Sequence, residues 1–145
     1  MIHFYNQDCN YKPTKRLVLR RWIEEVIRRE GYVAGEINYV FCSSDYHRQM
    51  NRDFLGHDYF TDVITFEERE SRVEQGVVSV EVYIDVATVT DNASLYNSLP
   101  INEMRRVIVH GALHLCGHLD KSPTAERNLR RMENRYLKLL RKEML

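Results

Sequence analysis

The sequence predicts an α+β domain in which helices pack on a small mixed sheet of four strands. Segments with the alternation and the β-branched and aromatic content of strands lie mostly in residues 1–85, and long helical patterns follow them. A chain of 145 residues has the length of one ordinary domain, and it contains no repeat and no linker-like tract. We therefore expect a single domain over residues 1–145.

The composition is that of a soluble globular protein, with 43% hydrophobic and 29% charged residues and a net charge of zero. These values exclude a disordered chain, and no apolar run is long enough to span a membrane. The first residues lack the pattern of a secretory signal, so we expect a cytoplasmic protein without a membrane partner. The three cysteines form no C-x-x-C pair, which predicts reduced packing residues and no disulfide framework.

The first helix is predicted in "KRLVLRRWIEEVIRREG", residues 15–31, where Gly31 supplies the stop. Its apolar residues follow helical spacing and define one buried face: Leu19, Trp22, Ile23, Val26 and Ile27. Before it, "IHFYN", residues 2–6, is suited to a strand at the edge of the sheet.

Three further strands are predicted at residues 36–42, 62–67 and 77–85, from β-branched and aromatic content and from alternation. Between the first two, Ser44 or Asp45 is expected to cap a short helix that runs through Phe54 and ends at Gly56.

Three helical segments are predicted in the rest of the chain. Residues 85–99 are weakly helical, and Pro100 marks the entry to a helix that stops at Gly117. Ser122 and Pro123 begin the last helix as N-cap and first helical residue. The apolar stripe of this last helix consists of Ala125, Leu129, Met132, Tyr136 and Leu140.

Charge is distributed unevenly along the chain. Residues 12–30 contain seven Lys or Arg against three acids, and residues 121–145 contain eight against three, whereas residues 53–103 contain eleven acids against two Arg. Charge alone favours solvated outer faces of two helices. If RNA is bound, these two basic segments are the expected contacts to its backbone.

Residues 107–121, "VIVHGALHLCGHLDK", contain three of the six histidines. His110 and His114 are four residues apart on a predicted helix, so both imidazoles can reach one metal ion. Gly117 ends that helix, after which either His118 or Asp120 can supply a third ligand. Three protein ligands with a fourth position for water are typical of catalytic zinc. Two histidines at this spacing are, taken alone, more often packing or surface residues. With His118 and Asp120 nearby in the sequence, a metal site and a packing role are about equally supported.

A metalloprotease uses the same histidine spacing but needs a Glu as general base directly after the first histidine, in the motif H-E-x-x-H. Gly111 occupies that position here, which argues against proteolysis.

The segment "HGALHLCGHLD", residues 110–120, resembles the signature H-G-x-L-H-L-x-G-Y-D-H of the bacterial YbeY endoribonuclease family, also described as ribosomal RNA maturation factors. Upstream, "MNRDFLGHDYFTDVITF", residues 50–66, is similar to that family's L-N-x-x-Y-R-G-K-D-x-x-T-D-V-L-S-F segment. The matching positions of this second motif are Asn51, Gly56, Asp58, Thr61, Asp62, Val63 and Phe66.

The resemblance implies a zincin-like fold and a zinc-dependent endoribonuclease specific for single-stranded RNA, acting in 16S ribosomal RNA 3′-end maturation and ribosome quality control. It also implies the small ribosomal subunit as a partner. One Zn²⁺ is expected on His110 and His114, and the third ligand of the family pattern, ten residues after the first, falls on Asp120 instead of the usual His. His118 then becomes a neighbour of the site.

A second departure concerns the Arg that the family places in its R-G-K-D segment and that is associated with activity. Leu55 stands at that position and His57 stands at the position of the Lys. Arg52 and His57 are the candidates for a positive charge near the scissile phosphate, although a surface role is the simpler expectation for Arg52. Asp62 is a candidate to orient a loop or bind the second nitrogen of a histidine, and the alternative is an ordinary strand-end cap.

Two other functions remain open from the sequence. One is a noncatalytic ribosome-assembly or RNA-binding factor with a structural metal, which the missing Arg at position 55 favours. The other is a zinc hydrolase of a small ester or amide.

Overall fold

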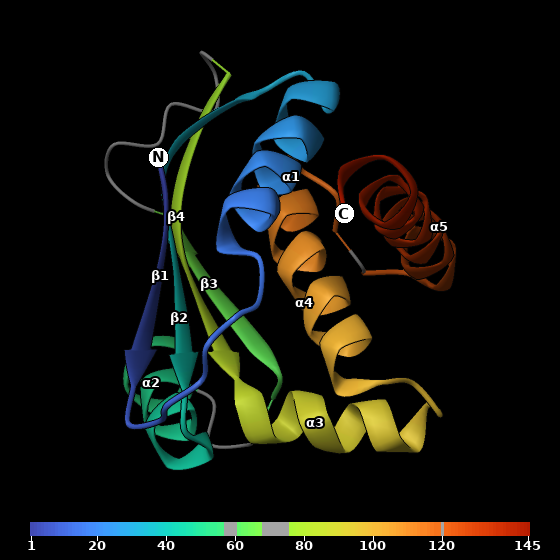
Figure 1. The fold of residues 1–145 in the computed structure, drawn as a ribbon. Coiled ribbons are helices and arrows are strands. Elements are labelled where there is room, and N and C mark those ends of the chain that lie inside the picture. The colour runs from blue at the N-terminus through green and yellow to red at the C-terminus, as the bar shows by residue number, and fades with distance from the viewer. Residues whose placement is uncertain (57–60, 68–75, 120) are drawn as a thin grey trace.

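Four strands form a mixed sheet in the order β1-β2-β4-β3 within the part of the chain that the computed structural model describes, residues 1–56, 61–67, 76–119 and 121–145. These strands are β1 (Ile2–Gln7), β2 (Val33–Cys42), β3 (Val63–Glu67) and β4 (Val77–Asp85). β1, β2 and β4 are parallel, and β3 pairs antiparallel with β4, as Thr65 opposite Val82 illustrates. The predicted α+β class and mixed sheet are confirmed, with β1 and β3 as the two edges (Figure 1).

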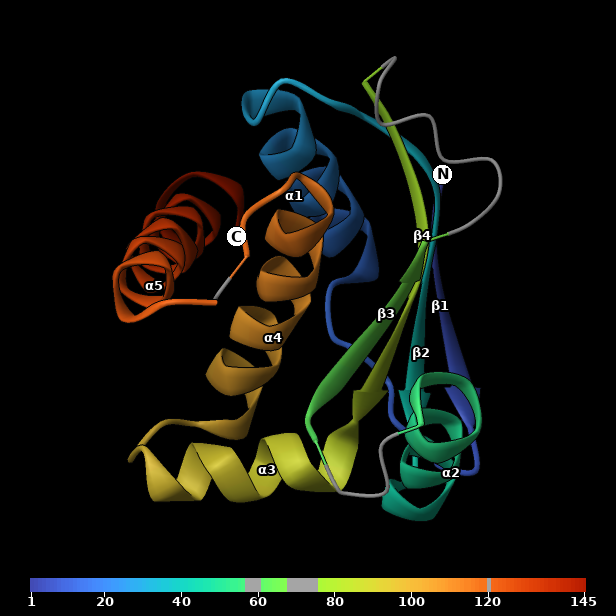
Figure 2. The ribbon, with the colours of Figure 1, turned by 180° about the vertical axis from the view of Figure 1, so that it is seen from behind.

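Helices α1 (Arg16–Arg29) and α4 (Pro100–Leu115) cover one face of the sheet, and α5 (Pro123–Leu139) packs outside them (Figures 1 and 2). A short π-helical turn, η2 (Leu140–Met144), follows α5. The indole N–H of Trp22, which is fully buried in α1, donates to the backbone oxygen of Tyr136 in α5 at 2.8 Å. This bond and the apolar stripes of the three helices hold them together as one layered core.

Two shorter helices lie at the end of the sheet to which β2 and β4 run. α2 (Ser44–Leu55) packs on β4 through His47, whose ring lies 2.8 Å from the backbone oxygen of Tyr83. α3 (Val86–Leu95) begins at the end of β4, where the Asp85 carboxylate accepts from the backbone N–H of Thr88 at 3.0 Å. The weakly helical segment therefore forms a helix, and the Asp85 side chain caps it by accepting from one of its first N–H groups, that of Thr88.

Two of the predicted boundaries were wrong. The N-cap of α2 is Ser43, whose hydroxyl accepts from the backbone N–H of Tyr46, and not Ser44 or Asp45. β2 begins at Val33 and not at residue 36, with a shift of register between Ala34 and Ile37 that alternation alone cannot reveal.

Glycines in the left-handed conformation end α1 and α4, as predicted. After α1, the N–H of Gly31 donates to the oxygen of Arg28 and that of the following residue to Ile27. After α4, the N–H of Gly117 donates to His114 and that of His118 to Leu113. Both ends are Schellman motifs, which turn the chain sharply.

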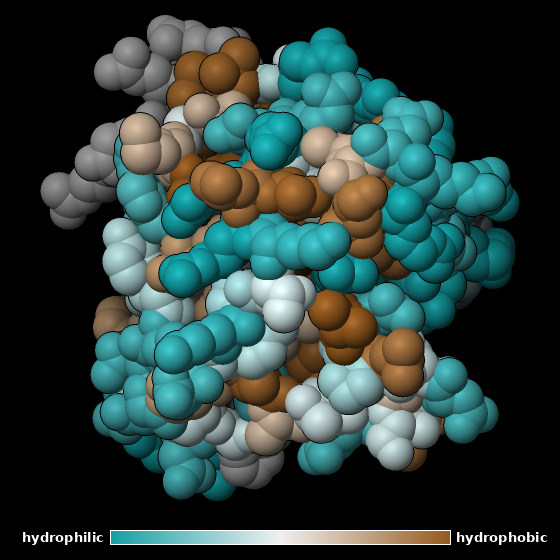
Figure 3. Space-filling model, viewed as in Figure 1, coloured by the Kyte–Doolittle hydropathy of each residue, from teal (hydrophilic) through white to brown (hydrophobic). Residues whose placement is uncertain are grey.

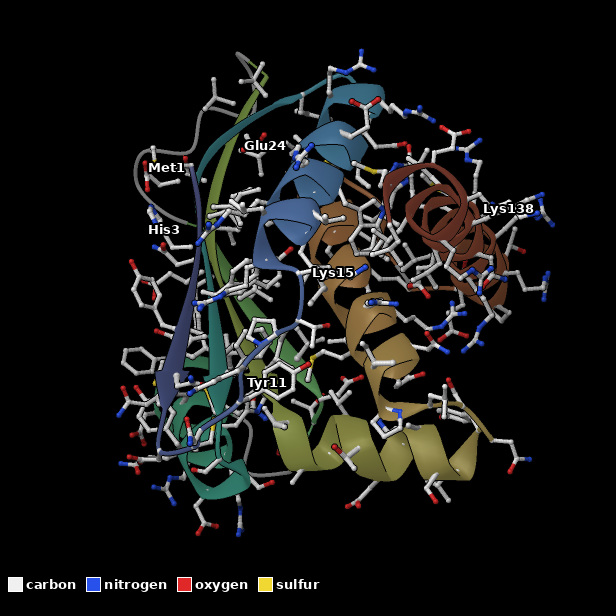
Figure 4. The ribbon with its side chains drawn as sticks, viewed as in Figure 1. Met1, His3, Tyr11, Lys15, Glu24 and Lys138 are labelled. Atoms are coloured by element: carbon white, nitrogen blue, oxygen red, sulfur yellow. The ribbon has the colours of Figure 1, made fainter. Side chains whose placement is uncertain are left out.

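The outer surface of α5 is polar, as its amphipathic sequence requires. Figure 3 shows mostly hydrophilic residues on the side of the molecule where α5 lies. Lys138 points away from the molecule on that side (Figure 4). No helix in the described ranges is both long and apolar enough to cross a membrane. The three cysteines are free, and two of them, Cys42 and Cys116, are buried, as predicted.

Candidate functional site

The structure brings His110 and His114 together on one side of α4. Their ring centroids are 4.8 Å apart, as expected for residues one helical turn apart. Both line a cavity of about 210 Å³ between α4 and the edge strand β3. The remaining lining comes from Thr61, Asp62, Val63 and Thr65. The two motifs that are far apart in the sequence, residues 50–66 and 107–120, therefore meet at this cavity.

A carboxylate from α5 holds His110 in place. Nδ1 of His110 lies 2.7 Å from Oε2 of Glu133, which is 5% exposed. A carboxylate accepts hydrogen bonds, so the ring hydrogen lies on Nδ1 and Nε2 keeps the lone pair of the neutral imidazole. This is the arrangement that orients a metal-binding histidine in many metalloproteins.

Arg106 completes this contact from the preceding turn of α4. Its Nη1 donates to Oε1 of Glu133 at 3.0 Å, and its Nη2 donates to the side-chain oxygen of Asn134 at 2.7 Å. The buried charge of Glu133 is thus paired, which lowers the cost of keeping a carboxylate in the helix interface.

The donor set fits a zinc ion, because two imidazoles lie side by side and one of them has a carboxylate behind it. The expected third ligand, Asp120, lies outside the described residues, as does His57. Among the residues that are described, no three His, Cys, Asp or Glu are grouped to hold a metal ion, so His118 does not join the pair.

His118 instead connects the turn after α4 to α1. Its Nε2 lies 2.6 Å from Oε1 of Glu30, and the hydroxyl of Tyr136 in α5 donates to the other oxygen of that carboxylate. This three-residue contact fixes the segment that leads from Gly117 toward residue 120. His118 therefore has a structural partner in Glu30.

Gly111 lies on the buried side of α4 and packs against β4. A Cβ atom at this position would lie 3.2 Å from Cγ1 of Val82, which is itself fully buried. A Glu here, as in a metalloprotease, would point its carboxylate into the sheet. The close packing of Gly111 against Val82 is thus a steric reason why the general-base Glu of the H-E-x-x-H motif is absent at this position.

A second cavity of about 320 Å³ adjoins the first one and lies between α3, α4 and α5. The two share Asp62 and His110 in their linings. Arg106 and Arg130 also line the second cavity and supply positive charge beside His110. Sequence reasoning missed both of these cations. Arg106 precedes His110 by four residues on α4, which was a signal for it, whereas Arg130 comes from α5, which only the fold brings to this helix.

Glu133 was also missed, although the sequence contained a signal for it. It follows Leu129 by four residues and precedes Tyr136 by three, so a charged residue stands on the apolar face of the last helix. An acid on such a face requires a buried partner.

The remaining candidates take other positions. Arg52 is exposed on α2, with its Nε 3.4 Å from Asp53, and it lines neither of these cavities. Leu55 is 39% exposed near the end of the same helix. Asp62 borders both cavities, and its backbone oxygen accepts from the N–H of Asp85 at 2.9 Å, but the partner of Nδ1 in His110 is Glu133.

Comparisons with known proteins agree with the motifs. The model of one protein family, described as Endoribonuclease YbeY, matches residues 2–141. A protein of that name from Cytophaga hutchinsonii is 40% identical over 138 residues, which cover 95% of this chain and 94% of the relative. Another from Porphyromonas gingivalis is 39% identical over 140 residues, covering 97% of this chain and 90% of the relative.

A solved structure shares the fold. The solution structure of TM1509 from Thermotoga maritima superimposes with a TM-score of 0.67 and covers 97% of this chain and 89% of that chain. Its sequence is 24% identical, so this likeness concerns the fold alone.

Proposed function

Since the chain belongs to the endoribonuclease YbeY family, we propose that it is a zinc-dependent endoribonuclease specific for single-stranded RNA. The fold is the zincin-like α+β arrangement of that family. The observation that carries the proposal is the pair His110 and His114 at the cavity beside β3, with Glu133 bound to the first histidine. The substrate we propose is ribosomal RNA, in 16S 3′-end maturation and ribosome quality control, which places the protein in the cytoplasm with the small ribosomal subunit as partner.

The proposed ligands of the zinc ion are His110, His114 and Asp120. A zinc ion held by them would supply positive charge next to the phosphodiester and would lower the pKa of a water molecule toward neutrality. Glu133 keeps His110 in one tautomer and one orientation, and Arg106 binds the other oxygen of Glu133 and holds it in place. These contacts prepare the histidine before any ligand arrives.

Arg130 offers a replacement for the positive charge that Leu55 cannot provide. It is exposed and lines the cavity next to His110, so its guanidinium can approach a phosphate group from solvent. Arg106 is less suited to that role, since both ends of its guanidinium already bind Glu133 and Asn134. The basic outer faces of α1 and α5 support contacts to the rest of an RNA backbone.

The ligand set is tested by measuring the metal content of purified variants. The wild-type chain is expected to bind about one zinc ion with three protein ligands, and His114→Ala and Asp120→Ala should each lose most of it. His118→Ala is the matched control, because His118 binds Glu30, and it should retain the metal. Undiminished zinc in Asp120→Ala would remove this residue from the ligand set.

The substrate class is tested by comparing single-stranded RNA, single-stranded DNA and a small ester, each with metal-free controls. Cleavage of RNA that disappears with the metal and with His114→Ala would support the proposal. Binding to the small ribosomal subunit without metal-dependent cleavage would favour the noncatalytic assembly factor, and hydrolysis of the ester alone would favour a small-molecule hydrolase.

A further inference from the structure

Glu103 is a buried acid that lines the cavity between α3, α4 and α5. It is 8% exposed, and no hydrogen bond to its carboxylate is found among the described residues. Burial raises the pKa of Glu103, since the desolvation outweighs the nearby charge of Arg106 and Arg130. The Glu103 oxygens are not among the fully buried atoms without a partner in the described residues, so its carboxylate reaches the open space of the cavity.

The position of Glu103 in α4 accounts for a negative charge there, but no residue that the structure describes accounts for the direction of its carboxylate. Glu103 lies in the first turn of α4, where the helix dipole favours negative charge. The nearest cation on its own helix, Arg106, is already committed to Glu133 and Asn134. The acceptor atoms of Glu103 are therefore left for a donor that enters the cavity.

The other lining residues indicate what kind of group that donor belongs to. Four acids and two arginines line the cavity. This excess of negative charge disfavours a phosphate inside the cavity, so the exposed Arg130 can meet a phosphate only at its rim, and the arginines disfavour a metal ion. Tyr96 also lines it and is 64% exposed, which leaves an aromatic ring available for stacking. A planar ligand with hydrogen-bond donors on its edge fits this combination, as nucleobases do.

The position of the cavity links it to the proposed chemistry. It shares His110 and Asp62 with the cavity of the histidine pair, so its occupant lies directly beside the metal-binding residues. Its volume of about 320 Å³ is at the lower end of small-molecule sites, which suits one base better than a longer segment.

We propose that this cavity binds one nucleobase of the RNA strand, next to the cleaved bond, and that Glu103 accepts a hydrogen bond from an amino group on the edge of that base. Adenine, cytosine and guanine carry such an amino group and uracil does not. The protein therefore prefers an amino-bearing base over uracil at one position beside the cut. This inference rests on the proposed endoribonuclease function.

The test uses four single-stranded RNA substrates that are identical except for one central base, placed in an otherwise uridine sequence. For the zinc-loaded wild type, kcat/KM should be roughly tenfold higher for at least one amino-bearing base than for uracil, and cleavage should lie beside it. Glu103→Met removes the acceptor at nearly constant volume and should abolish the preference. Tyr96→Ala should raise KM for all four substrates at least about fivefold, whereas Tyr96→Phe retains the stacking surface.

Asp91→Asn is the matched control, because Asp91 is an exposed acid on α3 that does not line the cavity. It should leave the base preference unchanged, and unchanged zinc content and far-ultraviolet circular dichroism show that the Glu103 variant is folded. A base preference that survives Glu103→Met, or cleavage without any preference, overturns the inference while the endoribonuclease proposal stands. Failure of the wild type to cleave any RNA contradicts the proposed function itself. Binding of Mn²⁺ that depends on Glu103 would show a cation site and would likewise overturn the inference.

Discussion

Glu133 of α5 binds two residues of α4, His110 and Arg106. Its carboxylate is bound by His110 on one oxygen and by Arg106 on the other, inside an interface where it is 5% exposed. A single side chain thus sets the tautomer of a proposed metal ligand and neutralises a neighbouring arginine. Residues of this kind, although they do not touch the metal, influence how strongly it is held.

We predict that Glu133→Gln weakens zinc binding by about ten- to a hundredfold, because the amide is a weaker acceptor for the Nδ1 hydrogen of His110. Competition with a chromophoric chelator measures this affinity. Glu126→Gln, an exposed position on the same helix, is the control and should bind zinc like the wild type. Equal affinities in all three proteins would mean that Glu133 has a purely structural role.

Helix α4 lies so close to the sheet that its spacing depends on a glycine. Gly111 faces Val82 on β4, and a Cβ atom there would approach a buried methyl group to 3.2 Å. The histidines on either side of Gly111 in the sequence project toward β3 and α5. The same helix therefore presents a flat face to the sheet and a polar face to the site.

Gly111→Leu is expected to lower the free energy of unfolding by about 2 kcal/mol, through overpacking against the sheet. Urea denaturation followed by circular dichroism measures the change. Ile101→Leu, at a partly exposed position of the same helix, is the control and should change stability by less than about 0.5 kcal/mol. If Gly111→Leu were as stable as the wild type, the close approach of α4 to β4 would be wrong.

A buried histidine between α2 and β4, His47, makes the stability of the folded protein depend on pH. His47 is fully buried between α2 and β4, its Nε2 donates to the backbone oxygen of Tyr83, and no partner is found for its Nδ1 in the described ranges. Burial lowers the pKa of His47 from the ordinary value of 6.5, although the carboxylates of Asp85 and Asp62 oppose the effect. Protonation of this side chain therefore disfavours the folded state.

Below about pH 6.5, the unfolded chain binds a proton at His47 that the folded chain does not bind until a lower pH. The contribution of neutral His47 is therefore fully present above this pH and is lost as the pH falls toward the folded-state pKa. We predict that the difference in unfolding free energy between wild type and His47→Gln shrinks between about pH 7 and about pH 5. Urea titrations across this range measure it, and a difference independent of pH would contradict the prediction.

The sequence predicted most elements because their signals are local. Apolar spacing located α1 and α5, Pro100 and Gly117 marked the two ends of α4, and Ser122 was correctly identified as the N-cap of α5. The start of β2 and the N-cap of α2 were misplaced by a few residues, since a register shift and a choice among neighbouring serines depend on contacts with other strands and turns. The family was identified from the two motifs at residues 50–66 and 110–120, and not from the periodicity of apolar residues.

What the sequence determined by itself was the histidine pair, because four-residue spacing on a helix places both rings together whatever else the chain does. What only the tertiary structure decided was the surroundings of that pair. Glu133, Arg130 and Tyr96 come from α5 and the end of α3, and they meet α4 because hydrophobic burial packs these elements against one another. Local pattern fixes which side of a helix a residue occupies, whereas long-range packing decides which side chains it meets there.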